Sequence, residues 1–223
     1  MSPIHCPFGL GNRVAAMANG LSRWGTITFR WPVNKHCPAT AADMFPTGVP
    51  GVDFLPGPER PEFATRWGGT MAHCWDACGD RERANAAYAT IMASMVGTAA
   101  AGAPRTAVLG RFHRNPAADP AWFAEEILRN FHGQRSGRIF LLCDLHRDII
   151  TSRLSRAGFD VMRPVCGSLA DDMERSRADV MDYASDWATL LAAARIIALD
   201  GPASALNPAR AAGIRIIYAA IKS

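Results

Sequence analysis

The sequence of 223 residues predicts an α/β protein in which parallel β-sheets are covered by helices and divided between two lobes. Strands alternate with helices through the second half of the chain, and most of these strands are apolar along their whole length. Such strands are typical of parallel sheets that are buried on both faces. Between the halves, TAAAGAP at 98–104 is small, flexible and ends in proline. It indicates a linker between an N-terminal lobe at 1–97 and a C-terminal lobe at 105–223.

In the first lobe, apolar residues at helical spacing predict a helix at 13–24. TITFRW at 26–31 alternates and is rich in β-forming residues, so it predicts a strand that the following proline ends. Residues 32–70 are rich in proline and glycine and predict a long irregular region, broken by a short helix around 41–45. Helical spacing returns at 81–96.

The second lobe shows a regular alternation of elements. Apolar runs predict strands at 106–112, 138–144, 159–165, 195–200 and 214–220. Helical spacing predicts helices at 120–132, 146–157 and 204–212, and one or two helices at 172–194.

Composition excludes several classes of function. The net charge is only +4, and the arginines are scattered, which argues against general nucleic-acid binding but suits recognition of phosphate or carboxylate. No run of 18 apolar residues predicts a transmembrane segment, and the N-terminus lacks the pattern of a secretory signal. Six widely spaced cysteines do not form a disulfide framework in a chain of this length. The cytoplasm is therefore the expected compartment.

PFGLGNRVAAMANGL at 7–21 places a Gly-x-Gly turn directly before an alanine-rich helix. Glycines let a ligand approach the backbone closely, and a helix N-terminus presents unpaired N–H groups. The turn is either a cradle for an anion or nucleotide, or an ordinary structural turn. The dinucleotide fingerprint requires a small residue where Val14 stands, and SPIHCPF ahead of the turn is too short and proline-rich for an ordinary strand. Both features speak against dinucleotide binding.

GLGNR, a helix, a strand and then WPVNKHCPATAADMF together resemble the opening of bacterial fucosyltransferase-like glycosyltransferases, which are related to the α-1,6- and O-fucosyltransferases. DWATLLAAARIIALDGPASALNPARAAG, near the end of the chain, resembles a second segment of that family. The matching positions in the first block are Gly9, Leu10, Gly11, Asn12, Arg13, Trp31, Pro32, Asn34, Cys37, Asp43 and Phe45.

The resemblance implies two Rossmann-like lobes, as in GT-B-like folds, with a nucleotide sugar held in the cleft, mostly by the C-terminal lobe. It implies an inverting transferase that uses a GDP-sugar, GDP-fucose foremost, as substrate and needs neither metal nor other cofactor. The acceptor, a glycan or small molecule, is expected on the N-terminal lobe. Gly9, Gly11, Asn12 and Arg13 are then donor-binding residues, with Asn12 hydrogen-bonding the sugar-phosphate.

The family places an arginine that contacts the donor phosphates after a central strand, and AVLGRFHRN corresponds to this stretch. Arg111, His113 and Arg114 supply the same chemical types in a different order, and we expect the catalytic groups among them. Across a strand end, Arg111 and His113 would point to one side and Arg114 to the other. The general base that takes the acceptor proton is either His113 or Asp76.

Two further donor-binding residues follow from the second segment. Ser204 is the one serine in DGPASAL, where the family usually presents two. Asp186 matches an aspartate that contacts the donor base; the alternative is a carboxylate at a helix N-terminus that interacts with the helix dipole.

Other interpretations stay open at this point. The altered AVLGRFHRN and DGPASAL stretches favour a non-catalytic nucleotide- or sugar-binding relative. An unrelated α/β nucleotide-dependent enzyme, such as an oxidoreductase, is a third hypothesis, against which Val14 and the short first strand speak. Three His-Cys pairs at 5–6, 36–37 and 73–74, the last followed by Cys78, allow a zinc site as a further alternative.

Overall fold

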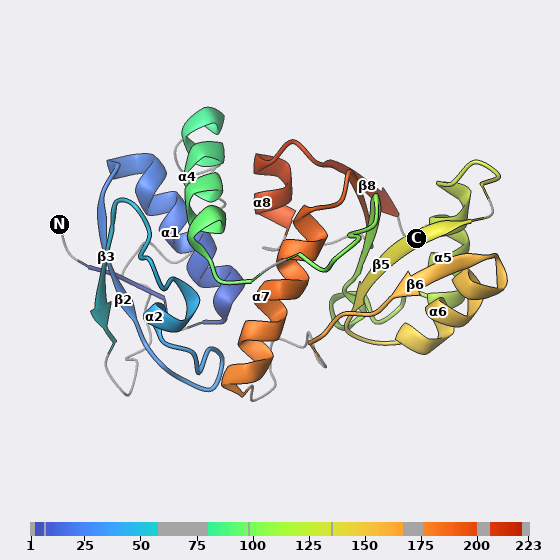
Figure 1. The fold of residues 1–223 in the computed structure, drawn as a ribbon, viewed down its shortest axis with the longest axis horizontal. Helices are drawn as coiled ribbons and strands as arrows, with labels where there is room; N and C mark the ends of the chain where they lie inside the picture. Colours follow the sequence, from blue (N-terminus) through green and yellow to red (C-terminus); the bar gives the residue numbers. More distant parts are fainter. Residues whose placement is uncertain are drawn as a thin grey trace. The chain divides into compact units, whose positions relative to one another are not determined.

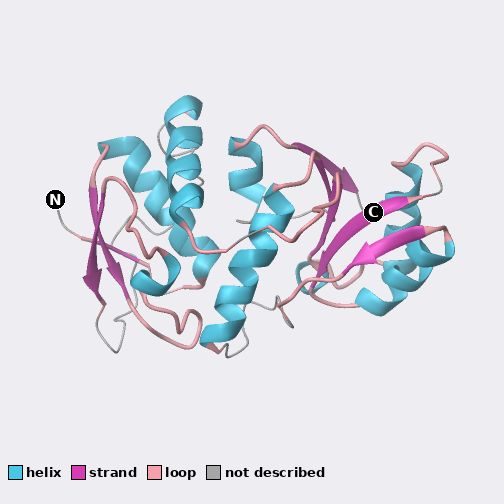
Figure 2. Cartoon of the chain, in the orientation of Figure 1, coloured by secondary structure: helices cyan, strands magenta, loops and turns pink. Residues whose placement is uncertain are grey.

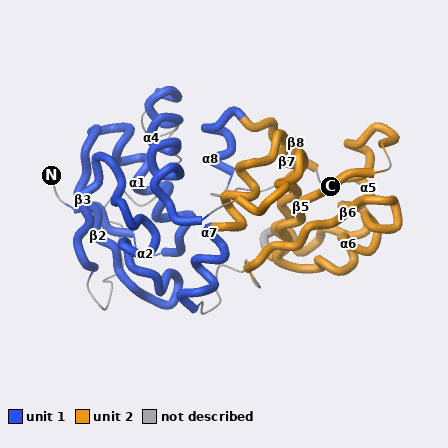
Figure 3. The backbone as a smooth tube through the Cα atoms, viewed as in Figure 1, with its two compact units in different colours: residues 1–97, 171–184, 204–213 blue, residues 98–170, 185–203, 214–223 orange. Residues whose placement is uncertain are grey.

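The computed structural model describes residues 3–6, 8–57, 80–97, 99–134, 136–166, 176–199 and 206–219. The chain divides into two compact units, which Figure 3 shows in different colours. Unit 1 comprises residues 1–97, 171–184 and 204–213, and unit 2 comprises residues 98–170, 185–203 and 214–223. Each unit contains a parallel sheet flanked by helices, so the predicted α/β fold class is confirmed.

The units differ in one respect from the division that the sequence predicts. The first change of unit, after residue 97, coincides with the predicted end of the N-terminal lobe. Residues 171–184 and 204–213, however, group with unit 1 although the sequence predicts them in the C-terminal lobe. The second of these segments carries helix α8 (Leu206–Ala211), which packs against helix α4 (Arg81–Ser94) of unit 1.

Unit 1 is built on a three-stranded parallel sheet with the order β1-β2-β3. Its strands are β1 (Ile4–His5), β2 (Ile27–Trp31) and β3 (Val52–Pro56), and its further helices are α1 (Leu10–Trp24) and α2 (Ala41–Met44). α1 contacts β1, β2 and α4, so it is covered on two sides, and almost all of its residues from Arg13 to Ser22 are buried. Gly20 makes the close approach to the sheet possible, because a Cβ there would lie 2.6 Å from Ile4 Cδ1.

Two features of this sheet differ from the sequence prediction. Strand β3 lies inside the region predicted to be irregular, because the prolines and glycines there bracket the strand rather than interrupt it. Gly48 and Gly51 have positive φ angles in the turn before it, and Pro56 ends it at the edge of the sheet, where a missing N–H is tolerated. The strand ahead of α1 is present but only two residues long, as the proline-rich sequence indicates.

Unit 2 is built on a five-stranded parallel sheet with the order β6-β5-β4-β7-β8. Its strands are β4 (Thr106–Gly110), β5 (Gly137–Cys143), β6 (Phe159–Met162), β7 (Arg195–Leu199) and β8 (Arg215–Ala219). Its helices are α5 (Pro120–Arg129) and α6 (Arg147–Arg156), with a 3₁₀ turn η1 (Phe112–Arg114), and α7 (Arg177–Leu191) passes from unit 1 into unit 2. α5 and α6 pack side by side on one face of this sheet (Figure 1).

The central strands of unit 2 account for the apolar runs in the sequence. β4 is buried at every residue, and β5 and β7 are buried from their second or third residue onward. The edge strands β6 and β8 are only partly buried and carry more polar residues. Side chains from β4, β5, β7, α5 and α6 form one apolar core around Val108, Phe123 and Leu141. Among the described residues, no helix has the length and apolar composition required to cross a membrane.

Close packing between β4 and β5 predicts the effect of one substitution. Gly110 is paired with Cys143, and a Cβ on Gly110 would lie 2.5 Å from Cys143 Sγ and 3.1 Å from Phe112 Cε2. We expect Gly110→Ala to lower the free energy of unfolding by about 1–3 kcal/mol in urea titrations, since a filled core cannot admit another methyl group. In the Cys143→Ala background the same substitution should cost less. Equal costs in both backgrounds would show that the sulfur does not limit the space.

Candidate functional site

The strand order of unit 2 marks one edge of its sheet as a ligand-binding position. The chain forms β4, β5 and β6 in one direction and then returns to add β7 and β8 on the other side of β4. In open parallel sheets, ligands bind outside the carboxyl ends of the strands where the order reverses. The residues that follow β4 and β5 at this edge are Arg111 and Asp144.

Asp144 holds the loop after β4 in place. Its side chain is 1% exposed. One carboxylate oxygen accepts hydrogen bonds from the backbone N–H of Phe112 (2.8 Å) and of Leu145 (2.8 Å), and the other accepts one from His113 N–H (3.3 Å). Backbone donors stabilise a buried carboxylate because they replace its lost hydration. The η1 turn is therefore fastened to the end of β5.

The imidazole of His113 lies between Asp144 and Arg111. Nδ1 of His113 is hydrogen-bonded to Asp144 Oδ2, and Nε2 lies 3.5 Å from Arg111 NH2. A carboxylate can only accept, so Nδ1 carries the proton of this hydrogen bond, and Nε2 is the nitrogen that faces the guanidinium. The arrangement combines a cation suited to an oxyanion with an oriented imidazole suited to proton transfer.

The predicted strand at 106–112 ends at Gly110, and the alternation expected beyond it does not apply, because residues 112–114 form a 3₁₀ turn. The prediction that Arg111 and His113 share a side is nevertheless confirmed, through the turn rather than through a strand. Arg114 is the last residue of η1. Its predicted catalytic role stays a prediction.

Sequence reasoning missed Asp144 and Arg147 at this edge. Arg147 NH2 donates to Cys143 O (3.0 Å) at the start of α6, and its buried Nε has no hydrogen-bond partner within the described part of the chain. A signal for Asp144 was present, because it follows a continuous apolar strand at the position where parallel sheets place functional side chains. The hydrogen bonds between Asp144 and the loop after β4 gave no such signal, because they join residues more than thirty positions apart.

In unit 1, the Gly-x-Gly sequence forms the start of α1, which begins at Leu10 and so three residues before the predicted start at 13. Gly9 is the N-cap residue, and its carbonyl accepts hydrogen bonds from Asn12 N–H (3.1 Å) and Arg13 N–H (3.2 Å). A Cβ on Gly9 would lie 3.7 Å from the nearest atom, His36 O, which is an ordinary van der Waals contact. Gly11 and Asn12 are half-buried. Their donor-binding roles stay predictions.

Arg13 is fully buried, unlike its neighbours in the turn. Its Nε donates to Phe8 O (2.7 Å), NH1 donates to Pro32 O (2.7 Å), and NH2 donates to Asn34 Oδ1 (3.3 Å). The guanidinium also lies over the ring of Trp31, 4.7 Å from its centroid. Burial lowers the pKa of Arg13 from the ordinary arginine value. These contacts give Arg13 a structural function, and the donor contact predicted for it stays a prediction.

The other residues of the WPVNKHC block also have structural functions. Asn34 Oδ1 accepts hydrogen bonds from the backbone N–H of His36 (3.0 Å) and Cys37 (3.1 Å), closing a tight turn. Trp31 Nε1 donates to Ala39 O (2.8 Å), and its ring packs edge-to-face against Phe45 (5.7 Å between centroids). The motif therefore specifies a loop conformation.

Asp186 and Ser204 are the remaining predicted donor-binding residues. Asp186 is 1% exposed, and its two oxygens accept hydrogen bonds from the backbone N–H groups of Val165 and Cys166, both 2.8 Å. It lies in the interior of α7, so the alternative of a carboxylate at a helix N-terminus is wrong. Its contact with a donor base stays a prediction. Ser204 lies outside the described residues.

Four of the cysteines, Cys6, Cys37, Cys143 and Cys166, are buried and form no disulfide. In the part of the chain that the structure describes, no three His, Cys, Asp or Glu side chains come together as metal ligands. His73, Cys74 and Cys78 lie outside that part, as does Asp76, the alternative general base.

Known structures share this fold, although neither a protein-family model nor a curated protein sequence matches the chain. A crystal structure of NodZ α-1,6-fucosyltransferase soaked with GDP-fucose matches with a TM-score of 0.54 at 12% identity, over 96% of this chain and 94% of that chain. NodZ co-crystallised with GDP matches with a TM-score of 0.51 at 14% identity, over 94% and 92%. Fucosyltransferase NodZ from Bradyrhizobium matches with a TM-score of 0.53 at 14% identity, over 94% and 93%. The fucosyltransferase-like, GT-B-like fold that the sequence resemblance implies is therefore confirmed.

The contacts of Arg13 predict a stability defect in the absence of any ligand. We expect Arg13→Lys to lower the free energy of unfolding by about 2–4 kcal/mol, because an ammonium group cannot satisfy three separated acceptors and leaves buried carbonyls unpaired. The measurement is urea unfolding of the nucleotide-free protein. Arg30→Lys, at an exposed position of β2, is the matched control and should change stability by no more than ~0.5 kcal/mol. If Arg13→Lys leaves the free energy of unfolding unchanged, Arg13 serves only ligand binding.

The buried thiols predict low reactivity in the native protein. Burial is the main cause that raises the pKa of Cys6 to about 11 and that of Cys143 to about 12. Because the thiolate is the nucleophile, we expect neither residue to react with iodoacetamide in mildly alkaline buffer, as read by peptide mass spectrometry. Both should react once the protein is unfolded in urea. Native-state alkylation of either would contradict their burial.

Proposed function

We propose that this chain is a metal-independent, inverting glycosyltransferase that transfers a sugar, fucose foremost, from a GDP-sugar to a glycan or small-molecule acceptor. The fold supports a transferase of the fucosyltransferase-like type. The observation that carries the proposal further is the group Arg111, His113 and Asp144 at the carboxyl ends of β4 and β5, where a parallel sheet of this order binds ligands.

Arg111 is proposed to stabilise the leaving group. When the glycosidic bond to a nucleoside diphosphate breaks, negative charge develops on the diphosphate oxygens. Without a metal ion, this charge must be met by fixed donors, and a guanidinium presents two N–H groups in the geometry of a phosphate edge. Arg111 is half-buried, so part of its hydration is already removed before the ligand binds.

His113 is proposed to move the acceptor proton. An inverting transfer requires a base that takes the proton of the attacking hydroxyl group. With Nδ1 donating to Asp144, Nε2 is the unprotonated nitrogen, and its electron pair, which faces Arg111 NH2, would take this proton. Asp144 is then a positioning residue that fixes the ring orientation and the tautomer. Gly9, Gly11 and Asn12 are proposed to serve ligand binding at the start of α1.

The contacts of Arg13 and Asp186 suggest different roles for these two residues. Both side chains are buried and hydrogen-bonded largely to backbone groups of neighbouring loops. We propose that they position the loops after β2 and β6 and do not themselves contact the donor. Recognition of the donor base would then require backbone or side-chain groups of those loops.

A second candidate function is nucleotide or sugar binding without transfer. The position of Asp186 favours it, because a carboxylate that is 1% exposed and hydrogen-bonded to the backbone of Val165 and Cys166 is poorly placed to recognise a guanine edge. Product formation from a GDP-sugar would exclude this candidate.

The test of donor binding is calorimetric titration with GDP, GDP-fucose and UDP in buffer without divalent metal. We expect GDP and GDP-fucose to bind more tightly than UDP, and Arg111→Gln to weaken GDP binding at least about tenfold, equivalent to about 1.4 kcal/mol for one charge-assisted contact. Arg153→Gln removes the same charge from an exposed ion pair with Glu125 on the helical face of unit 2, so its affinity should match the wild type.

His113→Gln separates binding from chemistry. It should keep GDP affinity within about threefold while abolishing release of GDP from GDP-fucose, if the imidazole serves proton transfer. Absence of binding by all three nucleotides, or equal GDP affinity in Arg111→Gln and wild type, would contradict the proposed donor site.

A further inference from the structure

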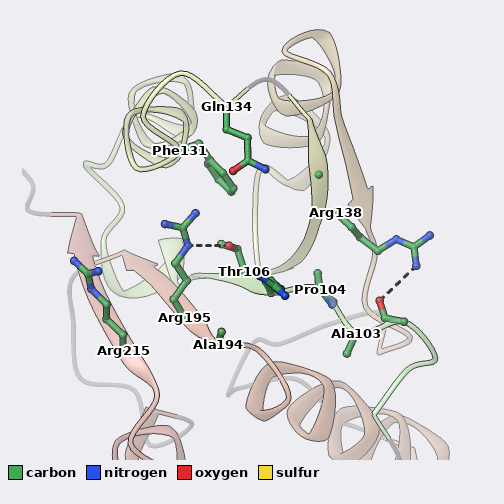
Figure 4. Close-up of a pocket in the computed structure, with 12 residues that line it drawn as sticks. Ala103, Pro104, Thr106, Phe131, Gln134, Arg138, Ala194, Arg195 and Arg215 are labelled. Carbon is green, nitrogen blue, oxygen red and sulfur yellow. Dashed lines mark hydrogen bonds between the residues drawn. The ribbon is translucent and has the colours of Figure 1, made fainter.

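A pocket opens at the opposite edge of the unit 2 sheet, where the strands begin. It has a volume of about 780 Å³ and is lined by residues at the starts of β4, β5, β7 and β8 and by the segment that precedes β4 (Figure 4). Strands rise about 3.3 Å per residue, so the length of β4 separates this pocket from Arg111. The pocket is distinct from the site proposed for the donor.

The pocket is strongly basic. Its described lining includes four arginines, Arg105, Arg138, Arg195 and Arg215, and no acidic residue. Arg138 is partly neutralised, because its Nε pairs with Asp160 Oδ2 at 2.7 Å. Within the described residues, Arg105, Arg195 and Arg215 have no carboxylate partner. Three guanidinium groups that lie in one concave site without a carboxylate partner attract anions.

Arg195 and Arg215 are direct neighbours across two parallel strands. They are register partners in the β7–β8 ladder, and Figure 4 shows both side chains extending along the same side of the pocket. Like charges at directly opposed positions destabilise a sheet. A pair of this kind is retained at a cost to stability, which a bound anion would remove by bridging the two cations.

Arg195 is also held in a fixed position. Its Nε donates to Thr106 Oγ1 (2.9 Å), its NH1 donates to Asn130 O (3.0 Å), and its guanidinium lies over the ring of Phe131, 4.7 Å from the centroid. All three partners are uncharged, so they orient the guanidinium without neutralising it. A guanidinium ordered in advance loses little entropy when it binds a ligand.

We propose that this pocket binds a small metabolite with two or more phosphate groups. Three uncompensated guanidinium groups match the charge of a diphosphate or bisphosphate, and the planar guanidinium fork matches phosphate oxygens. Phe131, Pro104 and Ala194 provide an apolar wall for the remainder of the ligand. This binding site is additional to the proposed donor site and does not depend on it.

The test uses the full chain with Arg111→Gln as background, so that the proposed donor site does not contribute. Inorganic diphosphate is titrated calorimetrically at physiological ionic strength. We expect one saturable site, a dissociation constant at least tenfold higher when Arg215→Gln is added, and no change when Arg153→Gln is added. In hydrogen exchange, diphosphate should protect the amides at the starts of β4, β7 and β8.

Three results would overturn the proposal: no saturable binding, equal affinity with and without Arg215, or citrate binding as tightly as diphosphate. Arg215→Gln should also have a melting temperature no lower than that of the wild type, because it removes a like-charge pair. If the variant loses diphosphate binding and also melts at a lower temperature, Arg215 is a structural residue and the proposal is overturned. A parallel titration with a hexose 1,6-bisphosphate identifies the ligand class. If it binds more tightly than diphosphate, the ligand is a phosphorylated sugar; if it binds more weakly, the ligand is the inorganic ion.

Discussion

The buried guanidinium of Arg13 is the interaction on which the rest of unit 1 depends. Removing a cation from water is costly, and the cost is offset only when acceptors surround it. The acceptors for Arg13 lie in two loops. Phe8 O is in the turn before α1, and Pro32 O and Asn34 Oδ1 are in the loop after β2. The two loops at the carboxyl ends of β1 and β2 therefore cannot move independently, and Gly9 and Asn12 are presented on a rigid frame.

In unit 2, buried carboxylates rather than a buried cation fix the loops at the carboxyl ends of the strands. Buried Asp144 collects N–H groups from the loops after β4 and β5, and Asp186 collects those of the loop after β6. In each case, a buried carboxylate accepts hydrogen bonds from backbone N–H groups, and Asp144 also contacts the imidazole of His113. Backbone partners hold a fixed loop conformation, because each N–H or C=O can be satisfied in only a narrow range of geometries. Arg111 and His113, on the same edge, are half-buried rather than buried.

The sequence predicts those features of the fold that local pattern determines. The buried strands β4, β5 and β7 are continuous apolar runs, and Asp119 and Pro120 mark the start of α5, where Asp119 caps Ala121 N–H at 2.8 Å. β3 escaped prediction because its five residues carry an internal aspartate and a terminal proline, which lower β-propensity at an edge. The burial of Arg13 and Asp186 escaped prediction for another reason. Their hydrogen-bond partners lie about twenty positions away, and helical or strand periodicity in the sequence does not predict such contacts. The family resemblance identified these residues as important, while only the structure shows what they touch.

The path of the chain has a consequence for how such a protein can be divided or recombined. The two compact units are made of six alternating segments, so the chain passes five times from one to the other, once within helix α7. A gene fragment that ends at residue 97 lacks α8, which packs on α4, and a fragment that begins at 98 carries α8 without its partner. Exchange of one unit between relatives by a single crossover would leave both products incomplete. The two sheets are therefore inherited together, and one of them cannot be replaced by a single exchange of chain halves.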